Sequence, residues 1–134
     1  MENDIVKVSP DIERAKSIIA MAAAREENLK TIDRKRFTSL VLEGYYEIIK
    51  ELITALLLID GFKTLSHKKL VEYLGNNYKT HFKRSELDLI DMLRVIRNRI
   101  TYEGFFAEEH FLIRREKDIK DIIEKLRTLL NKNL

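Results

Sequence analysis

Apolar side chains recur at spacings of three and four residues along most of this 134-residue chain, which is the period of an amphipathic helix. The alternation of apolar and polar residues that marks a half-buried strand is absent. Residues that break helices are scarce, since the chain has one proline and four glycines. We therefore predict an all-α fold in a single domain, residues 1–134, as an antiparallel up-and-down bundle of four main helices plus one short helix.

The helix boundaries follow from residues that start or stop a helix. Serine, proline and aspartate are typical of helix starts, and glycine is typical of helix ends. Phe105 and Phe106, just after Gly104, are expected to enter the core. The expected helices run from Ser9-Pro10-Asp11, with Ser9 as the cap, to about Lys30; from about Asp33 to Asp60, ended by Gly61; from His67 to Leu74, capped by Ser66 and ended by Gly75-Asn76-Asn77; from the Ser85-Glu86-Leu87-Asp88 start through Leu87 to Gly104; and from within residues 107–114 almost to the last residue.

The second expected helix is apolar on more than one side, so we expect it at the centre of the bundle. Its remaining side carries Glu43, Glu47, Glu51 and Thr54. Rows of charge usually face solvent, but this row could also face the arginines of the Leu87–Gly104 helix across a groove. The pattern alone leaves both interpretations open.

Polar chemistry gathers where the Leu87–Gly104 helix ends. Arg94, Arg97 and Arg99 lie within six residues, and Asn98 and Tyr102 are four apart and therefore neighbours on a helix surface. Guanidinium groups bind phosphate through two parallel hydrogen bonds and do not titrate. The net charge of +3 and the pI near 9.1 weakly favour a polyanionic partner, although Lys and Glu are mixed along every helix.

Several classes of function are disfavoured by what the sequence lacks. It has no cysteine, its three histidines lack metal-ligand spacing, and it has no glycine-rich phosphate loop or G-x-S-x-G motif. We therefore expect no metal and no cofactor. The short helix and the next long one are separated by about ten residues, more than the turn of a helix-turn-helix. The longest charge-free apolar run, Leu52–Ile59, is too short to span a membrane, and the N-terminus does not look like a signal peptide, so we expect a cytoplasmic protein with no membrane role.

The segment Arg97-Asn98-Arg99-Ile100-Thr101-Tyr102 resembles the motif of the HEPN family, a group of small all-helical domains. The resemblance covers nearly the whole chain, through GYYEIIKELITALLLIDGFK, SHKKLVEYL, LRVIRNRITYEG and the long last helix, and it is greatest to small stand-alone archaeal and bacterial members. The family motif is an arginine, usually a polar residue, a spacer and a histidine at the end of a helix. Arg97 and Asn98 match its first two positions, whereas Tyr102 stands at the place of the histidine and Gly104 where toxin-like members carry a tyrosine.

The resemblance implies a homodimer in which the motif helices of both subunits line a shared cleft. Many HEPN domains are metal-independent endoribonucleases of defence and toxin–antitoxin systems, many small members pair with a minimal nucleotidyltransferase as antitoxin, and others bind RNA without cutting it. Carried onto this chain, the resemblance implies catalytic positions at Arg97, Asn98 and Tyr102. It also implies a nucleic-acid-binding set of Arg94, Arg97, Arg99 and Tyr102.

The tyrosine at the histidine position decides the expected function. A tyrosine, with a pKa near 10, is a poor base at neutral pH, but it can donate a hydrogen bond or stack on a base. We therefore expect a protein that binds RNA or a nucleotide and belongs to a toxin–antitoxin-like pair. One alternative is an active metal-independent endoribonuclease in which Tyr102 or His110 transfers the proton. The other is a non-enzymatic protein-interaction module, with Arg97 a structural arginine paired with Glu47 or Glu51.

Overall fold

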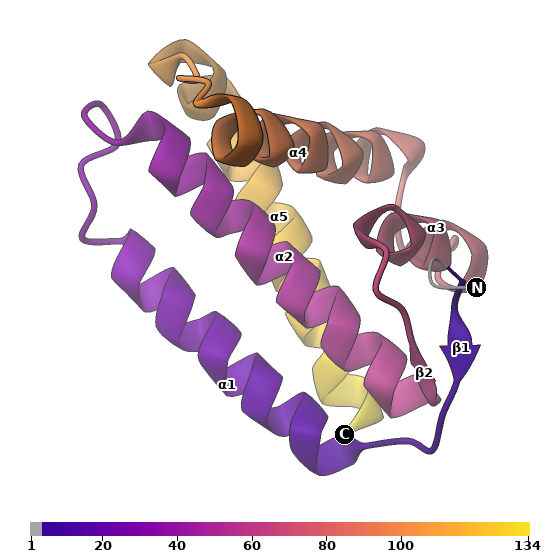
Figure 1. Ribbon diagram of the computed structural model, residues 1–134. Helices are drawn as coiled ribbons and strands as arrows, with labels where there is room; N and C mark the ends of the chain where they lie inside the picture. Colours follow the sequence, from indigo (N-terminus) through magenta and orange to yellow (C-terminus); the bar gives the residue numbers. More distant parts are fainter. Residues whose placement is uncertain (1–3) are drawn as a thin grey trace.

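The protein is all-α over residues 4–134, the part of the chain that the computed structural model describes (Figure 1). Four long helices and one shorter helix form a bundle, which confirms the predicted fold class. None of these described helices is both long enough and apolar enough to cross a membrane. The helices are α1 (Ile12–Leu29), α2 (Thr38–Asp60), α3 (His67–Asn77), α4 (Arg84–Glu103) and α5 (Glu109–Asn133).

Helix α2 is the centre of the bundle and packs against each of the other four helices. Its apolar residues cover most of its circumference, so that residues such as Ile48, Leu52 and Leu56 are fully buried. The predicted central position of this helix is therefore confirmed. One stripe of α2 stays only partly covered, and it carries Glu43, Glu47, Lys50, Glu51 and Thr54.

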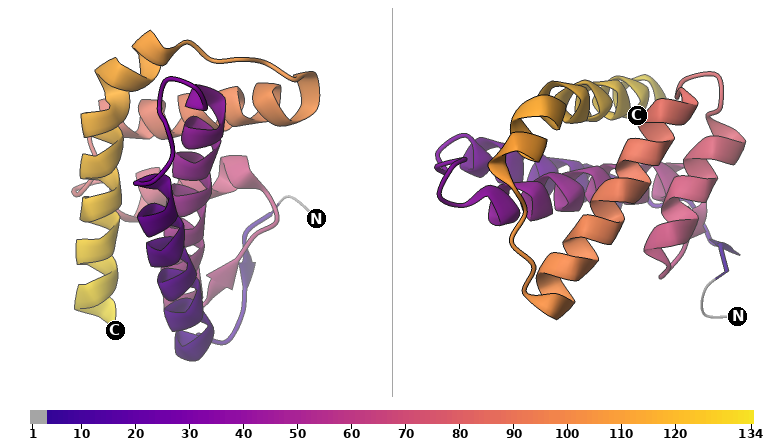
Figure 2. Two further views of the ribbon diagram at one scale, coloured as in Figure 1. Left: turned by 90° about the vertical axis from the view of Figure 1, so that its left-hand side faces the viewer. Right: turned by 90° about the horizontal axis from the view of Figure 1, so that it is seen from above.

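The four long helices do not all share one axis. Helices α1 and α2 form an antiparallel pair, while α4 crosses them steeply with α3 beside it (Figure 2). After α4 and an extended connection, α5 runs alongside α2 in the same direction (Figures 1 and 2). Helix α4 therefore does not run up or down the bundle like the other long helices. Because it crosses them, its arginine-rich end lies against the start of α2.

The start of α1 differs from the prediction. Asp11, not Ser9, is the cap, because its carboxylate accepts a hydrogen bond of 3.0 Å from the backbone N–H of Arg14. The chain before it continues onto the end of α2, and Val6–Lys7 (β1) pairs antiparallel with Phe62–Lys63 (β2). The expectation of no strand is therefore wrong for these residues. A ladder of two residues is too short to produce a pattern of alternation along the sequence.

Three further boundaries also differ. Helix α2 begins at Thr38 instead of Asp33, since the Asp33 carboxylate accepts the backbone N–H groups of Lys35 and Arg36 and forms a turn. Helix α3 continues through Gly75 to Asn77. Helix α4 begins at Arg84, so Ser85 lies inside it and does not cap it. The start of α4 is held by Glu86, whose side chain accepts the backbone N–H of Lys83 at 2.8 Å.

The predicted stops at Gly61 and Gly104 and the Ser66 cap are confirmed, whereas the stop predicted at Gly75 is wrong. Gly61 and Gly104 end α2 and α4 with φ of 87° and 66°, a conformation that residues with a Cβ rarely adopt. Ser66 accepts the backbone N–H of Lys69. The core position expected for Phe106 is wrong, because its side chain is 87% exposed, and Phe105 is only half-buried. After Gly104 the chain runs along the surface toward α5 instead of turning inward (Figure 2).

Candidate functional site

The crossing of α4 over α2 brings Arg97 onto the acidic row of α2. Arg97 Nη2 lies 3.5 Å from Glu47 Oε1, and one turn later the Thr101 hydroxyl donates a hydrogen bond of 2.9 Å to Glu43. Glu51, the next acid of the row, faces α1 instead, where its Oε1 lies 2.7 Å from Arg25 Nε. The acidic row therefore faces α4 at Glu43 and Glu47, which confirms that part of the groove interpretation.

The guanidinium of Arg97 is enclosed but poorly hydrogen-bonded. Its side chain is 18% exposed, Nη1 donates to Asn98 Oδ1 at 3.2 Å, and Nε is buried with no hydrogen-bond partner among residues 4–134. The nearest cation to Glu47 is Lys50, whose Nζ lies 2.6 Å from Oε2. A guanidinium carries five N–H donors, and because Nε of Arg97 is buried, only donors on the terminal nitrogens Nη1 and Nη2 can reach a ligand.

Glu47 stays ionised beside these cations. Burial opposes ionisation, but the hydrogen bond from Lys50 and the charges of Lys50, Arg97 and Arg25 together hold the pKa of Glu47 below its usual value. Around the cleft, the cations Arg25, Lys50 and Arg97 are balanced by the carboxylates Glu43, Glu47 and Glu51.

The three motif positions lie together at the end of α4. Asn98 contacts the Arg97 guanidinium, and the ring of Tyr102 has its centroid 6.0 Å from Arg97 Cζ, at the outer limit of a cation–π contact. Tyr102 is 76% exposed. The site thus offers a hydrogen-bonding cation, an amide and an open aromatic face in one place.

The other two predicted binding arginines are placed differently. Arg94 is mostly buried and donates a 2.9 Å hydrogen bond to Asp91 on its own helix. Arg99 stacks on Phe105, with Cζ 3.8 Å from the ring centroid, and lies 3.9 Å from Glu103. The structure therefore groups Arg97, Asn98 and Tyr102, with Arg94 one turn away, and engages Arg99 elsewhere.

A cleft of about 490 Å³ opens in front of Arg97, between α1 and α4 with α2 as its floor. Glu43, Glu47 and Thr101 line it together with Arg97, and Arg25 of α1 lines the opposite side. A cleft of this size admits a phosphate or a nucleotide fragment. It is the natural approach of a ligand to the Arg97 cluster.

His67 is the residue of this region that the sequence analysis missed. It is the first residue of α3, and its ring centroid lies 5.8 Å from that of Tyr46. Burial and the positive charges of Lys50, Arg97 and Arg94 lower the pKa of His67, against the opposing charge of Glu47. His67 is far from Arg97 in the sequence, so no local spacing could have paired the two residues.

His110, the histidine considered for proton transfer, lies in the first turn of α5 and is exposed. The connection after Gly104 carries the chain away from the end of α4 before α5 begins (Figure 2). Within residues 4–134, no hydrogen bond or ring contact joins His110 to Arg97, Asn98 or Tyr102. The same part of the chain holds no group of three or more His, Asp or Glu side chains arranged to bind a metal ion.

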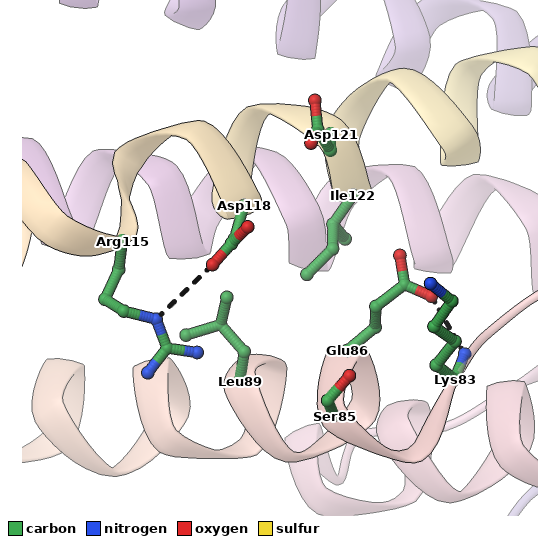
Figure 3. A pocket seen from close by; sticks show the side chains of 8 residues that line it. All are labelled: Lys83, Ser85, Glu86, Leu89, Arg115, Asp118, Asp121 and Ile122. Carbon is green, nitrogen blue, oxygen red and sulfur yellow. Dashed lines mark hydrogen bonds and ion pairs between the residues drawn. The ribbon is translucent and has the colours of Figure 1, made fainter.

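A second charged hollow, of about 210 Å³, lies between α4 and α5 (Figure 3). Its charges are already matched: Arg115 lies 3.7 Å from Asp118, and Glu86 binds the Lys83 backbone and Lys125. Because its polar groups have protein partners, this hollow is a weaker candidate than the Arg97 cleft.

No known protein family, no characterised protein and no solved structure matches this chain. The functional conclusion therefore depends on the chemistry of the Arg97 cluster and on the resemblance of its sequence to the HEPN motif.

Proposed function

We propose that this protein is a HEPN-like RNA-binding domain that holds an RNA phosphate at Arg97. The observation that carries the proposal is the guanidinium of Arg97 at the wall of the cleft, whose terminal nitrogens make contacts only at 3.2 and 3.5 Å among the described residues and so keep N–H donors for a phosphate.

Tyr102 and Asn98 supply what RNA needs besides a cation. The exposed ring of Tyr102 next to Arg97 is suited to stacking on an unpaired base. The Asn98 side chain, held by Arg97, can hydrogen-bond a ribose or a base edge. We therefore expect single-stranded RNA to be preferred over duplex.

The proposal includes a homodimer, as the resemblance implies. An apolar surface next to the site supports it: Leu40 and Phe106 are 51% and 87% exposed, and they line a hollow of about 540 Å³ with Phe37, Ile100 and Phe105. Exposed apolar patches of this kind mark protein interfaces. A minimal nucleotidyltransferase as the partner in a toxin–antitoxin-like pair belongs to the same proposal and rests on the resemblance alone.

One observation favours a second candidate. The contact between Arg97 and Glu47 is the one expected if Arg97 only ties α4 to α2 and the protein is a non-enzymatic interaction module. The two candidates differ in salt dependence, because phosphate contacts release counterions and weaken steeply as salt increases.

The test is the binding of a fluorescently labelled single-stranded RNA pool at several salt concentrations by the wild type, Arg97→Ala and Arg84→Ala. Arg84 is a control on the same helix, since its side chain is 88% exposed and pairs with Asp88. We expect Arg97→Ala to weaken binding by roughly ten- to one-hundredfold, as the loss of a charged hydrogen bond does, and Arg84→Ala by less than about twofold.

Two results would contradict the proposal. Absence of salt-dependent RNA binding by the wild type would favour the interaction module. Equal losses in Arg97→Ala and Arg84→Ala would mean that RNA is attracted by net charge and not held at this site. Binding of free nucleotides in competition with the pool distinguishes a nucleotide site from an RNA site.

A further inference from the structure

The hollow of about 540 Å³ between the start of α2 and the end of α4, here called the Phe37 hollow, has mostly apolar walls. Its apolar side chains come from the α2 side, from α4 and from the connection after α4, and they are Phe37, Leu40, Ile100, Phe105 and Phe106. Phe37, Leu40 and Phe106 are 38%, 51% and 87% exposed, so much of their apolar surface is open to water. An apolar ligand that covers this surface gains the free energy of removing it from water.

The two hydroxyl groups that line this hollow already have protein partners. The Ser39 hydroxyl accepts the backbone N–H of Ala107 at 2.8 Å and donates to the carbonyl oxygen of Phe105 at 3.4 Å. The Thr38 hydroxyl donates to the carbonyl oxygen of Arg34 at 2.6 Å. Because neither hydroxyl needs a ligand to complete its hydrogen bonds, we expect the part of a ligand that enters the hollow to be apolar.

The charged residues that line the hollow are both cations. They are Lys35 and Arg36, just before α2, and no Asp or Glu of the described chain lines it, whereas the Arg97 cleft has acids beside its cations. Neither cation forms an ion pair within residues 4–134: the Asp33 carboxylate accepts only their backbone N–H groups, and the Arg36 guanidinium lies 5.1 Å from the centre of the Phe37 ring. The first turn of α2, with no acidic residue and no side-chain cap, adds to the positive potential. The hollow therefore combines an apolar wall with unmatched positive charge.

We propose that the Phe37 hollow binds a small amphiphilic carboxylate of the fatty-acid class. The chain of this ligand lies against the apolar wall, and its carboxylate lies at Lys35 and Arg36. Charge complementarity selects this class, because a neutral apolar ligand leaves both cations unused and an inorganic anion leaves the apolar wall exposed. The inference goes beyond the proposed function, since it assigns a second site and does not depend on RNA binding at Arg97.

Size and charge favour a small ligand as the occupant over a second copy alone. A hollow of about 540 Å³ falls within the range of roughly 300–1,000 Å³ that is typical of small-molecule sites. A symmetric contact between two copies through this face brings Lys35 and Arg36 of one copy into the same interface as the identical cations of the other. A carboxylate bound to each copy offsets that repulsion, so the ligand is compatible with the proposed homodimer.

The experiment measures the binding of decanoate at low salt by isothermal titration calorimetry, with decanol as the neutral ligand of equal chain length. The variant Lys35→Gln/Arg36→Gln removes both cations of the hollow, and Lys79→Gln/Lys120→Gln removes the same charge from exposed lysines elsewhere. We expect the first variant to weaken decanoate binding about fivefold, as the loss of two exposed charge contacts does, and to leave decanol binding within about twofold. The control variant should bind both ligands as the wild type does.

A second pair of variants tests the apolar wall. Leu40→Ser shortens a side chain of the hollow that is 51% exposed, and Met21→Ser does the same on α1 at a side chain that is 53% exposed. We expect Leu40→Ser to weaken decanoate and decanol alike, by about fivefold, and Met21→Ser to change neither by more than about twofold. Leu40 also lines the Arg97 cleft, so Arg97→Ala is included, and it should bind decanoate as the wild type does.

Three results would overturn the inference. Equal affinity for decanoate and decanol, or equal losses in the two double variants, would mean that Lys35 and Arg36 hold no carboxylate. Loss of decanoate binding in Arg97→Ala would place the ligand in the Arg97 cleft. Absence of decanoate binding by the wild type would leave the surface to a membrane or to a second copy, which co-sedimentation with phosphatidylglycerol vesicles and the oligomeric state of Leu40→Ser distinguish. Failure of RNA binding, in contrast, overturns only the proposed function and leaves this site standing.

Discussion

Two enclosed arginines of this bundle, Arg34 and Arg97, differ in how completely they are bonded. Arg34, in the turn before α2, donates to the carbonyl oxygens of Leu29 and Ile32 and to Glu116 of α5. Arg97 contacts Glu47 and Asn98 at 3.5 and 3.2 Å and leaves Nε without a partner among the described residues. Both are mostly covered, with 27% and 18% of their side chains exposed.

The difference shows what each arginine is suited to. Around Arg34, the Tyr45 hydroxyl completes the cluster by donating to Glu116 at 2.5 Å, and burial together with the Glu116 carboxylate raises the pKa of Tyr45. Such a network, with its donors and acceptors matched, joins the end of α1, α2 and α5. The Arg97 guanidinium, by contrast, makes two long contacts through its terminal nitrogens and lies at the wall of a cleft, which suits a ligand better.

The largest effect should come from removing the matched arginine. We expect Arg34→Met to lower the free energy of unfolding by about 2–3 kcal/mol, because it leaves Glu116 and two carbonyl oxygens without their cation. Arg97→Met should cost less than about 1 kcal/mol, since its contacts are long and Glu47 keeps Lys50. Urea unfolding of both variants measures this, and equal losses would mean that Arg97 is structural too.

Tyr102 should give the next largest effect, on binding alone. Stacking of a base on an aromatic ring contributes about 1 kcal/mol or more, so we expect Tyr102→Ala to weaken single-stranded RNA binding about fivefold or more and Tyr102→Phe to leave it nearly unchanged. Because the ring is 76% exposed, neither variant should change the melting temperature appreciably. A loss in Tyr102→Phe as large as that in Tyr102→Ala would show that the hydroxyl, and not the ring, contacts RNA.

The grouping of Arg97, Asn98 and Tyr102 could be predicted from the sequence better than the matched cluster could, and the reason is distance along the chain. These three residues lie within two turns of one helix, so their neighbourhood follows from helical spacing. Arg34 and Glu116 meet only through the packing of α5 on α2, and no local pattern pairs residues so far apart in sequence. His67 was missed for the same reason, since only the packing of α3 brings it beside Tyr46.

The helix boundaries also differ in whether local residues or tertiary contacts determine them. Gly61 and Gly104 were predicted because a left-handed residue at a helix end depends on the residue type itself. The start of α4 was misplaced because Ser85 and Glu86 both offer start signals, and Glu86 is further held in place by Lys125 of α5 at 2.8 Å. Where two local signals compete, a tertiary contact favours one of them, and that contact is not visible in the sequence.

A smaller effect is expected from the carboxylate that competes with a ligand for Arg97. Glu47→Gln removes one negative charge beside Arg97 and Lys50, so we expect RNA to bind about threefold more tightly at low salt. The control is Glu27→Gln on α1, whose carboxylate pairs with Lys30 and is largely exposed. Weaker binding in Glu47→Gln than in Glu27→Gln would mean that Glu47 positions Arg97 and does not compete for it.

The smallest effect concerns stability against pH, and its sign follows from His67. Burial and the charges of Lys50, Arg97 and Arg94 lower the pKa of His67 in the folded protein, so between that value and 6.5 the unfolded chain binds more protons than the folded one. Stability should therefore be complete above pH 6.5 and should decrease as the pH falls through the lowered pKa. Urea midpoints of the wild type and His67→Asn over this range measure the difference, which should narrow toward acid because the variant has no group to protonate. A midpoint difference that stays constant with pH would mean that neither burial nor the cations of the groove lower the pKa of His67. The contrast between the Arg34 cluster and the Arg97 cluster would then depend only on the contacts of the two arginines.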